Sequence, residues 1–189
     1  MAKTLKPIPI PKGVTVTFAN SKFTVKGPLG SLELPVSPNI KITTNENQIN
    51  VEKTDNVAPA IVGTTRALIR SMLEGVTKGY EKILEVRGVG YKAQKTKDGV
   101  QLTLGFSHPV HIKPPPGITF EVKNVPNPED PKTLITEIII KGIDKQLVGT
   151  TAAQIRSISP PDVYHGKGIR YAGEYVRKKA GKRAAVAQT

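Results

Sequence analysis

The chain has 189 residues, enough for one large or two small domains, and 38% of them are hydrophobic, which suffices for an apolar core. Its 28 Lys and Arg residues exceed its 15 Asp and Glu residues; the formal net charge of +13 indicates a polyanionic partner, with nucleic acid favoured over an anionic membrane. The absence of cysteine excludes disulfides, thiolate metal sites and cysteine nucleophiles, and no stretch approaches the roughly 18 apolar residues of a membrane span.

The first part of the chain has the pattern of short strands followed by one helix. Apolar and polar residues alternate as in strands with one buried face. The expected strands cover residues 14–18, 22–27 and 31–36, and a hairpin covers residues 41–53. Asp55 or Asn56 is placed to cap a helix that runs from about residue 58 to residue 78.

The second part repeats this order after a link near residues 79–81. The expected strands cover residues 83–94, 100–106, 108–113, 118–123 and 133–142. Between the first two, Lys97-Asp98-Gly99 is a strong hairpin-turn signal. Asp144 is placed to cap a second helix, which carries residues 147–158.

An internal repeat relates the two parts. Residues 61–72 (IVGTTRALIRSM) and 147–158 (LVGTTAAQIRSI) are identical at eight of twelve positions, at an offset of 86 residues. Two copies with so long a period indicate duplicated domains and not a solenoid. The predicted fold class is α+β, with two tandem duplicated domains, each an antiparallel-rich β-sheet packed against one main helix, plus a basic C-terminal extension. The expected boundaries are 1–81, 82–160 and 161–189.

The repeated helix motif contains residues of low helix propensity. Glycine and threonine are poor helix formers, so we expect a packing reason for them, such as a close approach of helix to sheet at Gly63 and Gly149. Arg70 and Arg156 occupy equivalent positions in the two copies. They are either ion-paired structural residues or phosphate contacts.

The sequence indicates no catalytic, metal or cofactor site. Residues 87–93 (RGVGYKA) superficially match a dinucleotide fingerprint, but that motif needs a helix after the glycines, and here the strand continues toward the hairpin turn. The glycines therefore indicate a bulge or a close backbone approach. His108 and His111 lack the cysteine or carboxylate companions of a metal site. Because no nucleophile stands beside a base, we expect no enzyme, no cofactor and no small-molecule substrate.

The basic C-terminal segment is the strongest candidate for function. Residues 165–189 carry seven Lys and Arg side chains and one acidic residue, Glu174, so that +6 of the net charge of +13 lies here. Its glycines allow the backbone to approach phosphates, and Tyr164, Tyr171 and Tyr175 can stack on unpaired bases. We expect such a segment to fold on RNA, with counterion release supplying most of the affinity. The competing interpretation is a solvated tail that serves only solubility.

Motifs along nearly the whole chain carry a family resemblance. They are KPIPIPKGV (6–14), VKGPLGSLEL (25–34), the two GTT helices, LEVRGVGYKA (84–93) and GKGIRYAGE (166–174). Together they closely resemble the bacterial-type large ribosomal subunit protein L-six family. The chain departs from the usual pattern of that family at His165, where Lys is usual, and in residues 1–5.

The resemblance implies a structural role in the ribosome without catalysis. Family members bind large-subunit rRNA mainly through the C-terminal domain and extension, near the stalk base, beside other large-subunit proteins and close to the elongation-factor GTPases. The resemblance implies rRNA binding by the residues that match the motif of the family, namely Tyr164, Gly166, Lys167, Gly168, Ile169, Arg170 and Tyr171. Electrostatics adds Arg177, Lys178, Lys179, Lys182 and Arg183, and His165 lies among them as a further contact.

We therefore expect a constituent of the large ribosomal subunit that holds 23S-type rRNA near the translation-factor site and supports translation. The N-terminus has no apolar run of the signal-peptide kind, so we expect a cytoplasmic ribosomal protein, or one of an organelle stroma or matrix.

The alternative is a protein–protein adaptor with an incidental basic tail, which predicts salt-insensitive binding to a protein. A membrane-surface role would need a continuous amphipathic basic helix, which Gly166, Gly168, Gly173 and Gly181 disfavour.

Overall fold

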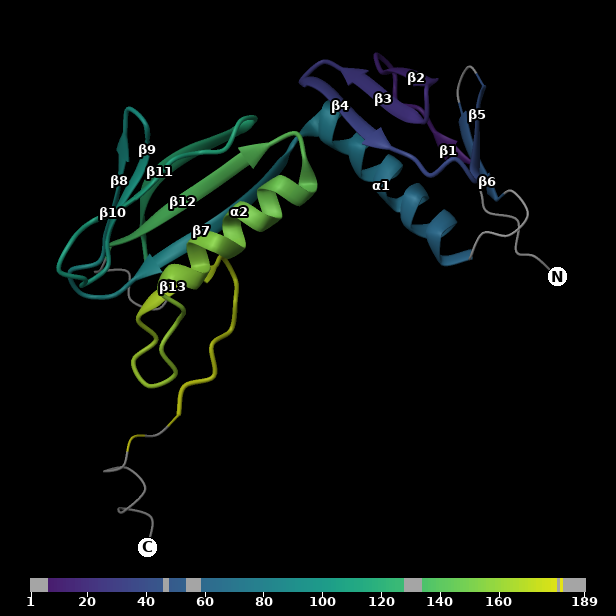
Figure 1. Cartoon of the computed structure of the whole chain (residues 1–189). Helices are drawn as coiled ribbons and strands as arrows, with labels where there is room; N and C mark the ends of the chain where they lie inside the picture. Colours follow the sequence, from purple (N-terminus) through teal and green to yellow (C-terminus); the bar gives the residue numbers. More distant parts are fainter. Residues whose placement is uncertain (1–6, 46–47, 54–58, 128–133, 180, 182–189) are drawn as a thin grey trace, which may run out of the picture. The chain divides into compact units, whose positions relative to one another are not determined.

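The computed structural model describes residues 7–45, 48–53, 59–127, 134–179 and 181 (Figure 1). The chain divides into two compact units. Unit 1 comprises Met1–Tyr80 with Ile143–Lys145, and unit 2 comprises Glu81–Gly142 with Gln146–Thr189. Neither helix among the described residues has the length and hydropathy that crossing a membrane requires.

The described residues of unit 1 form two three-stranded antiparallel sheets and one helix. The strand orders are β1-β6-β5 and β2-β3-β4. Its elements are β1 (Ile8–Pro9), β2 (Thr15–Ala19), β3 (Lys22–Gly27), β4 (Gly30–Pro35), β5 (Ile40–Asn45), β6 (Gln48–Lys53) and α1 (Pro59–Lys78). Both sheets and α1 contribute to one apolar core, in which Phe23, Ile49 and Ile69 are fully buried.

Local backbone chemistry sets the turns of unit 1. Asn20 and Ser21 join β2 to β3 with φ angles of 51° and 59°, and two successive left-handed residues suit the twist of a β-hairpin. α1 is followed by Gly79, whose φ is 74° and whose N–H donates to the Gly75 carbonyl at 3.0 Å. A glycine in this conformation caps a helix C-terminus without strain.

In the part of unit 2 that the structure describes, the chain forms a four-stranded sheet, a three-stranded sheet and one helix. The strand orders are β11-β12-β7-β13 and β10-β9-β8. Its elements, of which β7 and α2 begin with a residue grouped with unit 1, are β7 (Tyr80–Arg87), β8 (Lys92–Thr96), β9 (Gly99–Thr103), β10 (Val110–Ile112), β11 (Ile118–Pro126), β12 (Leu134–Gly142), α2 (Lys145–Ile158) and β13 (Gly168–Tyr171). α2 lies alongside β7 and β12 (Figure 1) and buries Val148, Thr151, Ala152 and Ile155.

The predicted fold class is confirmed, because each unit combines antiparallel sheets with one main helix. α2 begins directly after Asp144, as expected, whereas the predicted caps Asp55 and Asn56 lie outside the described residues. The two units differ from the predicted boundaries in three places. Glu81 groups with unit 2, Ile143–Lys145 groups with unit 1, and the C-terminal extension groups with unit 2.

The prediction of one continuous strand over residues 83–94 is wrong. The segment forms β7 and β8, which belong to different sheets. Between them Gly88 (φ 144°) and Gly90 (φ 81°) adopt conformations that favour glycine, and the Tyr91 N–H donates to the Gly88 carbonyl at 3.1 Å. The glycines thus make a turn and not a bulge. The predicted hairpin at Lys97-Asp98-Gly99 is confirmed, because Thr96 pairs with Gly99.

The expected close approach at Gly63 and Gly149 is also wrong. A Cβ added at either glycine would meet no atom within 4 Å. The neighbouring Thr64 and Thr65 hydroxyls donate to the carbonyls of Ala60 and Ile61 at 3.0 and 2.9 Å, which satisfies these polar groups within α1. Close approach occurs instead at Gly142, where a Cβ would lie 2.6 Å from Ile118 Cδ1.

Candidate nucleic-acid interface

The basic segment begins as an integral strand of the unit 2 sheet. β13 pairs antiparallel with β7, so that Gly168 lies opposite Arg87 and Tyr171 opposite Leu84. Ile169 is fully buried. The expectation that the segment as a whole folds only on RNA is therefore wrong for Gly168–Tyr171, because burial of Ile169 and pairing with β7 stabilise this strand in the protein alone.

Arg170 forms part of a buried charged cluster. Its Nε donates to Glu85 Oε2 at 3.2 Å, and Arg87 Nε donates to the same oxygen at 2.8 Å. Arg170 is only 7% exposed. A buried ion is strongly unfavourable without a partner. The Arg170–Glu85 pair links β13 to β7, and Arg87, on β7 itself, binds the same carboxylate. The structure thus places Arg170 inside unit 2, with its side chain on protein.

A closed loop precedes β13. The Asp162 N–H donates to the Lys167 carbonyl at 2.7 Å, and the Gly166 N–H donates to the Asp162 carbonyl at 2.9 Å. The Asp162 carboxylate accepts the His165 N–H at 2.8 Å and lies 3.0 Å from the same residue's Nδ1. Backbone N–H groups of His165 and then Tyr164 lower the pKa of Asp162, with a further contribution from the His165 side chain. These bonds hold the loop in one shape, with Lys167 exposed.

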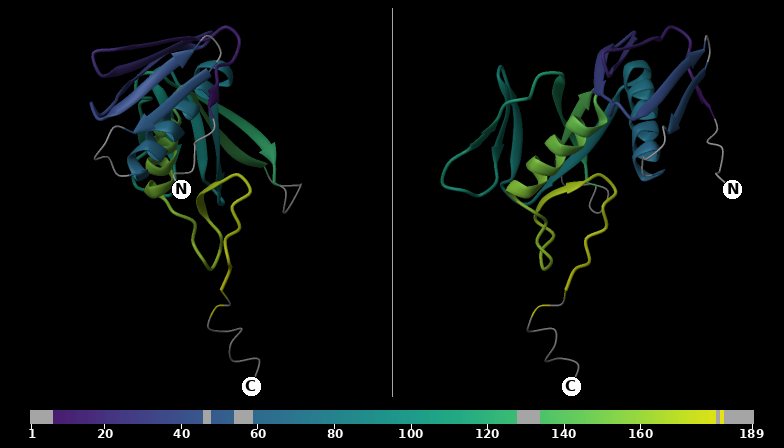
Figure 2. Two further views of the ribbon diagram at one scale, coloured as in Figure 1. Left: turned by 90° about the vertical axis from the view of Figure 1, so that its right-hand side faces the viewer. Right: turned by 45° about the vertical axis from the view of Figure 1, so that its right-hand side comes forward.

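The chain returns beside this loop after β13. The Glu174 N–H donates to the Tyr171 carbonyl at 3.0 Å, and the Lys179 N–H donates to the Val163 carbonyl at 2.9 Å. A Cβ added at Gly166 would lie 3.2 Å from Lys178 Cε. Figure 2 shows the two stretches running next to each other below the sheet of unit 2. We call residues 161–167 together with 174–179 the basic finger.

Glu174 connects the basic finger to the body of unit 2. Its Oε2 accepts Arg156 Nε at 3.1 Å and the Tyr171 N–H at 3.0 Å, while its Oε1 accepts Arg156 Nη2. The Arg156 guanidinium also lies over the Tyr171 ring, 5.7 Å from its centroid, and Lys82 Nζ lies 5.9 Å from it. The hydrogen bonds from Arg156 are the main cause of the lowered pKa of Glu174, and they raise the pKa of Arg156.

The two arginines of the repeat therefore differ. Arg156 is an ion-paired structural residue, in agreement with one of the two interpretations of the motif. Arg70 has a side chain 75% exposed, and its pair with Glu74 is one turn away on the same helix at 3.4 Å. Such an exposed pair contributes little to stability.

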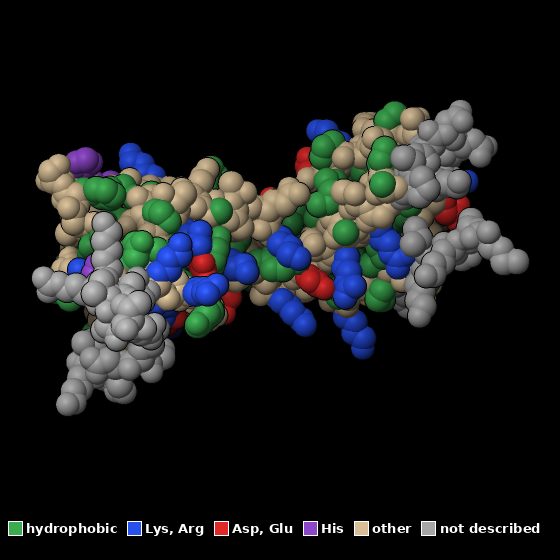
Figure 3. Space-filling model, turned by 90° about the horizontal axis from the view of Figure 1, so that it is seen from below, with side chains coloured by type: hydrophobic (Ala, Val, Ile, Leu, Met, Phe, Trp, Pro, Cys, Tyr) green, Lys and Arg blue, Asp and Glu red, His purple; other side chains and the backbone are tan. Residues whose placement is uncertain are grey.

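The predicted rRNA-binding residues are distributed between the surface and the interior. The exposed ones are Tyr164, His165, Lys167, Arg177, Lys178 and Lys179. Gly168 and Arg170 are buried, Gly166 and Tyr171 are half-buried, and Lys182 and Arg183 lie outside the described residues. Tyr175, at 88% exposure, presents more of its ring than Tyr164 at 55%. Figure 3 shows further Lys and Arg side chains on the surface of each unit, with acidic side chains between some of them.

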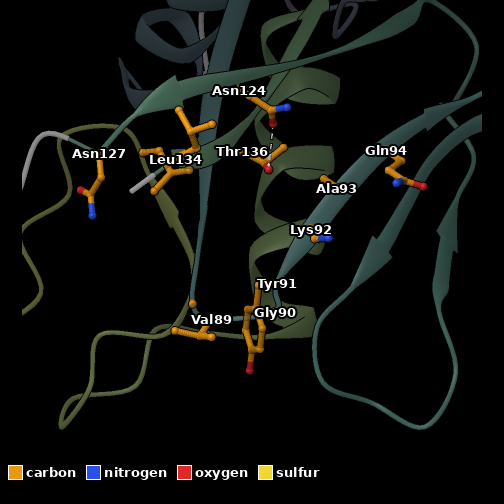
Figure 4. A pocket seen from close by; sticks show the side chains of 12 residues that line it. Val89, Gly90, Tyr91, Lys92, Ala93, Gln94, Asn124, Asn127, Leu134 and Thr136 are labelled. Carbon is orange, nitrogen blue, oxygen red and sulfur yellow. Dashed lines mark hydrogen bonds between the residues drawn. The ribbon is translucent and has the colours of Figure 1, made fainter. Parts of the chain in front are cut away.

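The β7–β8 turn lies next to the basic finger. Gly168, the first residue of β13, pairs with Arg87, the last residue of β7. Lys167, which precedes β13, and Gly88, which follows β7, therefore lie at the same end of this strand pair. Val89 is 92% exposed at this turn and borders an open cavity of about 670 Å³, which is also lined by Lys92, Asn124 and Leu134 (Figure 4). Sequence reasoning missed this turn as a neighbour of the site, although a valine between two glycines signals an exposed apolar tip.

The described residues contain no cluster of His, Asp and Glu that could hold a metal ion. His108 and His111 are both exposed, and the His108 ring stacks on Phe106 with centroids 6.5 Å apart. The site thus presents cationic and aromatic side chains, which can bind an anionic polymer.

Comparison with known proteins identifies the family. The model for ribosomal protein L6 matches residues 10–79 and again residues 87–172. The chain belongs to the ribosomal protein L6 family. It is 48% identical over 179 residues to large ribosomal subunit protein uL6 of Shouchella clausii, covering 94% of this chain and 95% of that one. The identity to uL6 of Thermus thermophilus is 47% over 181 residues, covering 95% of each chain.

Membership of the L6 family confirms the resemblance read from the motifs. The two matched regions reproduce the internal repeat, and the second ends at residue 172, directly after β13. This L6-family protein is a structural constituent of the ribosomal large subunit and not an enzyme.

Proposed function

We propose that this L6-family protein holds large-subunit rRNA through the basic finger of unit 2. The observation that carries the proposal is the fixed arrangement of four exposed cationic side chains, Lys167, Arg177, Lys178 and Lys179. Exposed aromatic rings accompany them at Tyr164 and Tyr175. Backbone hydrogen bonds hold both stretches, so the cations occupy defined positions relative to unit 2.

Folded rRNA brings phosphates of several helices close together, and a cationic finger on a rigid body offsets their repulsion. Binding of each phosphate by Lys or Arg releases counterions, which makes the interaction favourable and salt-dependent. A-form RNA is recognised mainly by shape, phosphates and 2′-hydroxyls, while exposed aromatic rings stack on unpaired bases. The finger therefore supplies phosphate contacts with few base-specific ones.

The proposal extends to the position within the subunit, and its support there is the family resemblance of the motifs. We place the contact near the stalk base, beside neighbouring large-subunit proteins and close to where elongation-factor GTPases act. In this position the protein keeps rRNA segments in place for translation and performs no chemical step. Buried Arg170 supports the contact through the cluster with Glu85, which fixes the strand that carries the finger.

The test compares two variants of equal charge. One replaces the four finger cations (Lys167, Arg177, Lys178 and Lys179) with Gln, and the control replaces four exposed lysines elsewhere in unit 2 (Lys95, Lys97, Lys113 and Lys123). Side-chain changes are preferable to ending the chain at residue 163, because that truncation would also remove β13. Affinity for large-subunit rRNA is measured over a salt series.

We expect the finger variant to lose affinity and about 3 units of log–log salt slope, since each phosphate contact contributes ~0.7–0.9. The control should keep most of both. Equal losses in the two variants would refute the localisation to the finger. Binding that is insensitive to salt and to both sets of changes would favour the protein–protein adaptor instead.

A further inference from the structure

We propose that Asp162 and Glu174 are positioning residues that give the basic finger its shape, and that this shape makes the protein select folded rRNA over other polyanions. The proposal rests on the function proposed above. These are the two acidic residues within 161–179. Both engage the finger or its base, and both have carboxylates that are held by several donors.

Carboxylates beside phosphate-binding lysines are unfavourable for RNA binding as such. Each adds a like charge to the phosphate ridge and reduces the positive potential of the segment. Long-range electrostatics alone therefore predicts that removing either negative charge strengthens the binding of any polyanion. A different effect of their removal requires that the carboxylates act through the geometry of the finger.

Glu174 fixes the near end of the returning stretch. It joins α2 through Arg156 and β13 through the Tyr171 N–H, so that one carboxylate ties the finger to two elements of unit 2. The Lys179 N–H bond to the Val163 carbonyl fixes the far end of the same stretch. Arg177 and Lys178 lie between these two points and are thereby held beside the loop.

Asp162 fixes the other stretch. Its carboxylate accepts the His165 N–H and faces His165 Nδ1, while its main chain bonds both Lys167 and Gly166. With a carboxylate as acceptor, the Nδ1 atom carries the proton. His165 thus contributes a loop-closing contact here, at the position where the resemblance leads one to expect a Lys.

Pre-ordering changes which polyanions bind well. A flexible cationic tail loses conformational entropy on binding but adapts to any array of phosphates, whereas a pre-ordered finger loses less entropy and fits only phosphates in a matching arrangement. Selectivity is the difference between these affinities. Replacing either carboxylate with the neutral amide should therefore lower the affinity for the matching RNA. The affinity for unrelated polyanions should stay the same or increase.

The experiment uses the full chain with Glu174→Gln or Asp162→Asn, and with Glu121→Gln as a matched control. Glu121 is also a partly exposed carboxylate of unit 2 with a lowered pKa, caused mainly by Lys141, but it lies on β11. Affinities for large-subunit rRNA and for poly(U) are measured at one salt concentration. Thermal unfolding of each variant monitors the fold.

We expect each finger variant to bind rRNA about tenfold more weakly and poly(U) equally or more tightly, while the control binds both slightly more tightly. A double variant that exchanges the ion pair, Arg156→Glu with Glu174→Arg, should bind rRNA more tightly than Glu174→Gln does, because the pair is formed again with the charges reversed. Tighter rRNA binding by Glu174→Gln and Asp162→Asn, as in the control, would overturn the inference. If the unaltered chain does not prefer rRNA to poly(U), the proposed function itself fails.

Discussion

Glu174 illustrates how a single side chain couples pH to the stability of the site. Its pKa in the folded protein is lowered from the ordinary 4.5, chiefly by hydrogen bonds from Arg156. A group whose pKa is lowered by folding contributes stability above its unfolded pKa, and this contribution is lost as pH falls through the folded value. The Arg156–Glu174 pair should thus stabilise unit 2 at neutral pH and cease to do so in acid.

We predict that Glu174→Gln destabilises unit 2 at pH 7 and that the difference from the unaltered chain shrinks as the pH falls below about 4. The measurement is urea unfolding of both proteins at several pH values between 3 and 7. Asp162 and Glu121 titrate with the same sign in both proteins, so the difference between the curves isolates Glu174. If the difference in unfolding free energy stayed constant with pH, the charge of Glu174 in the Arg156–Glu174 pair would contribute nothing to stability.

The cationic and aromatic residues of the site were predictable from the sequence, because charge density and residue type are visible there. Their burial was not. Arg170 lies in the basic C-terminal segment, yet its partner Glu85 is 85 residues away in the chain. Only the pairing of β13 with β7 brings these two residues together. The structural role of Arg156 was one of two open interpretations for the same reason.

At the scale of elements, the sequence predicts the helices and hairpins correctly but misses the short strand β13 and the β7–β8 turn. The two helices and the antiparallel hairpins carry strong periodicity or turn signals of their own, so local sequence determines them. β13 has four residues, includes a glycine, and gains its place only from the edge of a distant strand. The β7–β8 turn was missed because alternation continues across residues 88–91, while two glycines redirect the backbone.

Gly168 determines how β13 enters the sheet. Its φ is 135°, and a Cβ at this position would lie 2.6 Å from the Pro160 carbonyl oxygen. We predict that Gly168→Ala destabilises unit 2 by about 2–4 kcal/mol, since backbone strain alone is of order 1–3 kcal/mol. Gly173→Ala is the matched control, because Gly173 also has a positive φ, 77°, but open space around it.

Chemical unfolding of the two glycine variants measures this effect. The larger loss should belong to Gly168→Ala, together with weaker rRNA binding if β13 carries the finger. Equal destabilisation of both variants would mean that the positive φ accounts for the whole loss of stability. The Pro160-Pro161 segment would then move to accommodate the added Cβ without loss of stability.

At the scale of the whole molecule, duplication has produced two units with the same helix motif and different surroundings. Ile69 in α1 and Ile155 in α2 are equivalent in the repeat, and each is almost completely buried in the core of its own unit. In α2 the arginine of the motif, Arg156, is bound by Glu174 of the basic finger. A matched pair of core substitutions can therefore test whether stability is shared between the units and whether unit 2 alone binds RNA.

We predict that Ile69→Ala and Ile155→Ala each destabilise their own unit by about 2–5 kcal/mol, the usual range for a buried isoleucine. Calorimetry should show the lowered transition in a different unit for each variant. Near the lowered transition temperature, rRNA binding should decline with Ile155→Ala and persist with Ile69→Ala, because the finger is fixed to α2 and β13. Equal losses of binding would show either that the units unfold as one cooperative body or that unit 1 contributes its own RNA surface, and hydrogen exchange of α1 and α2 would separate these two outcomes.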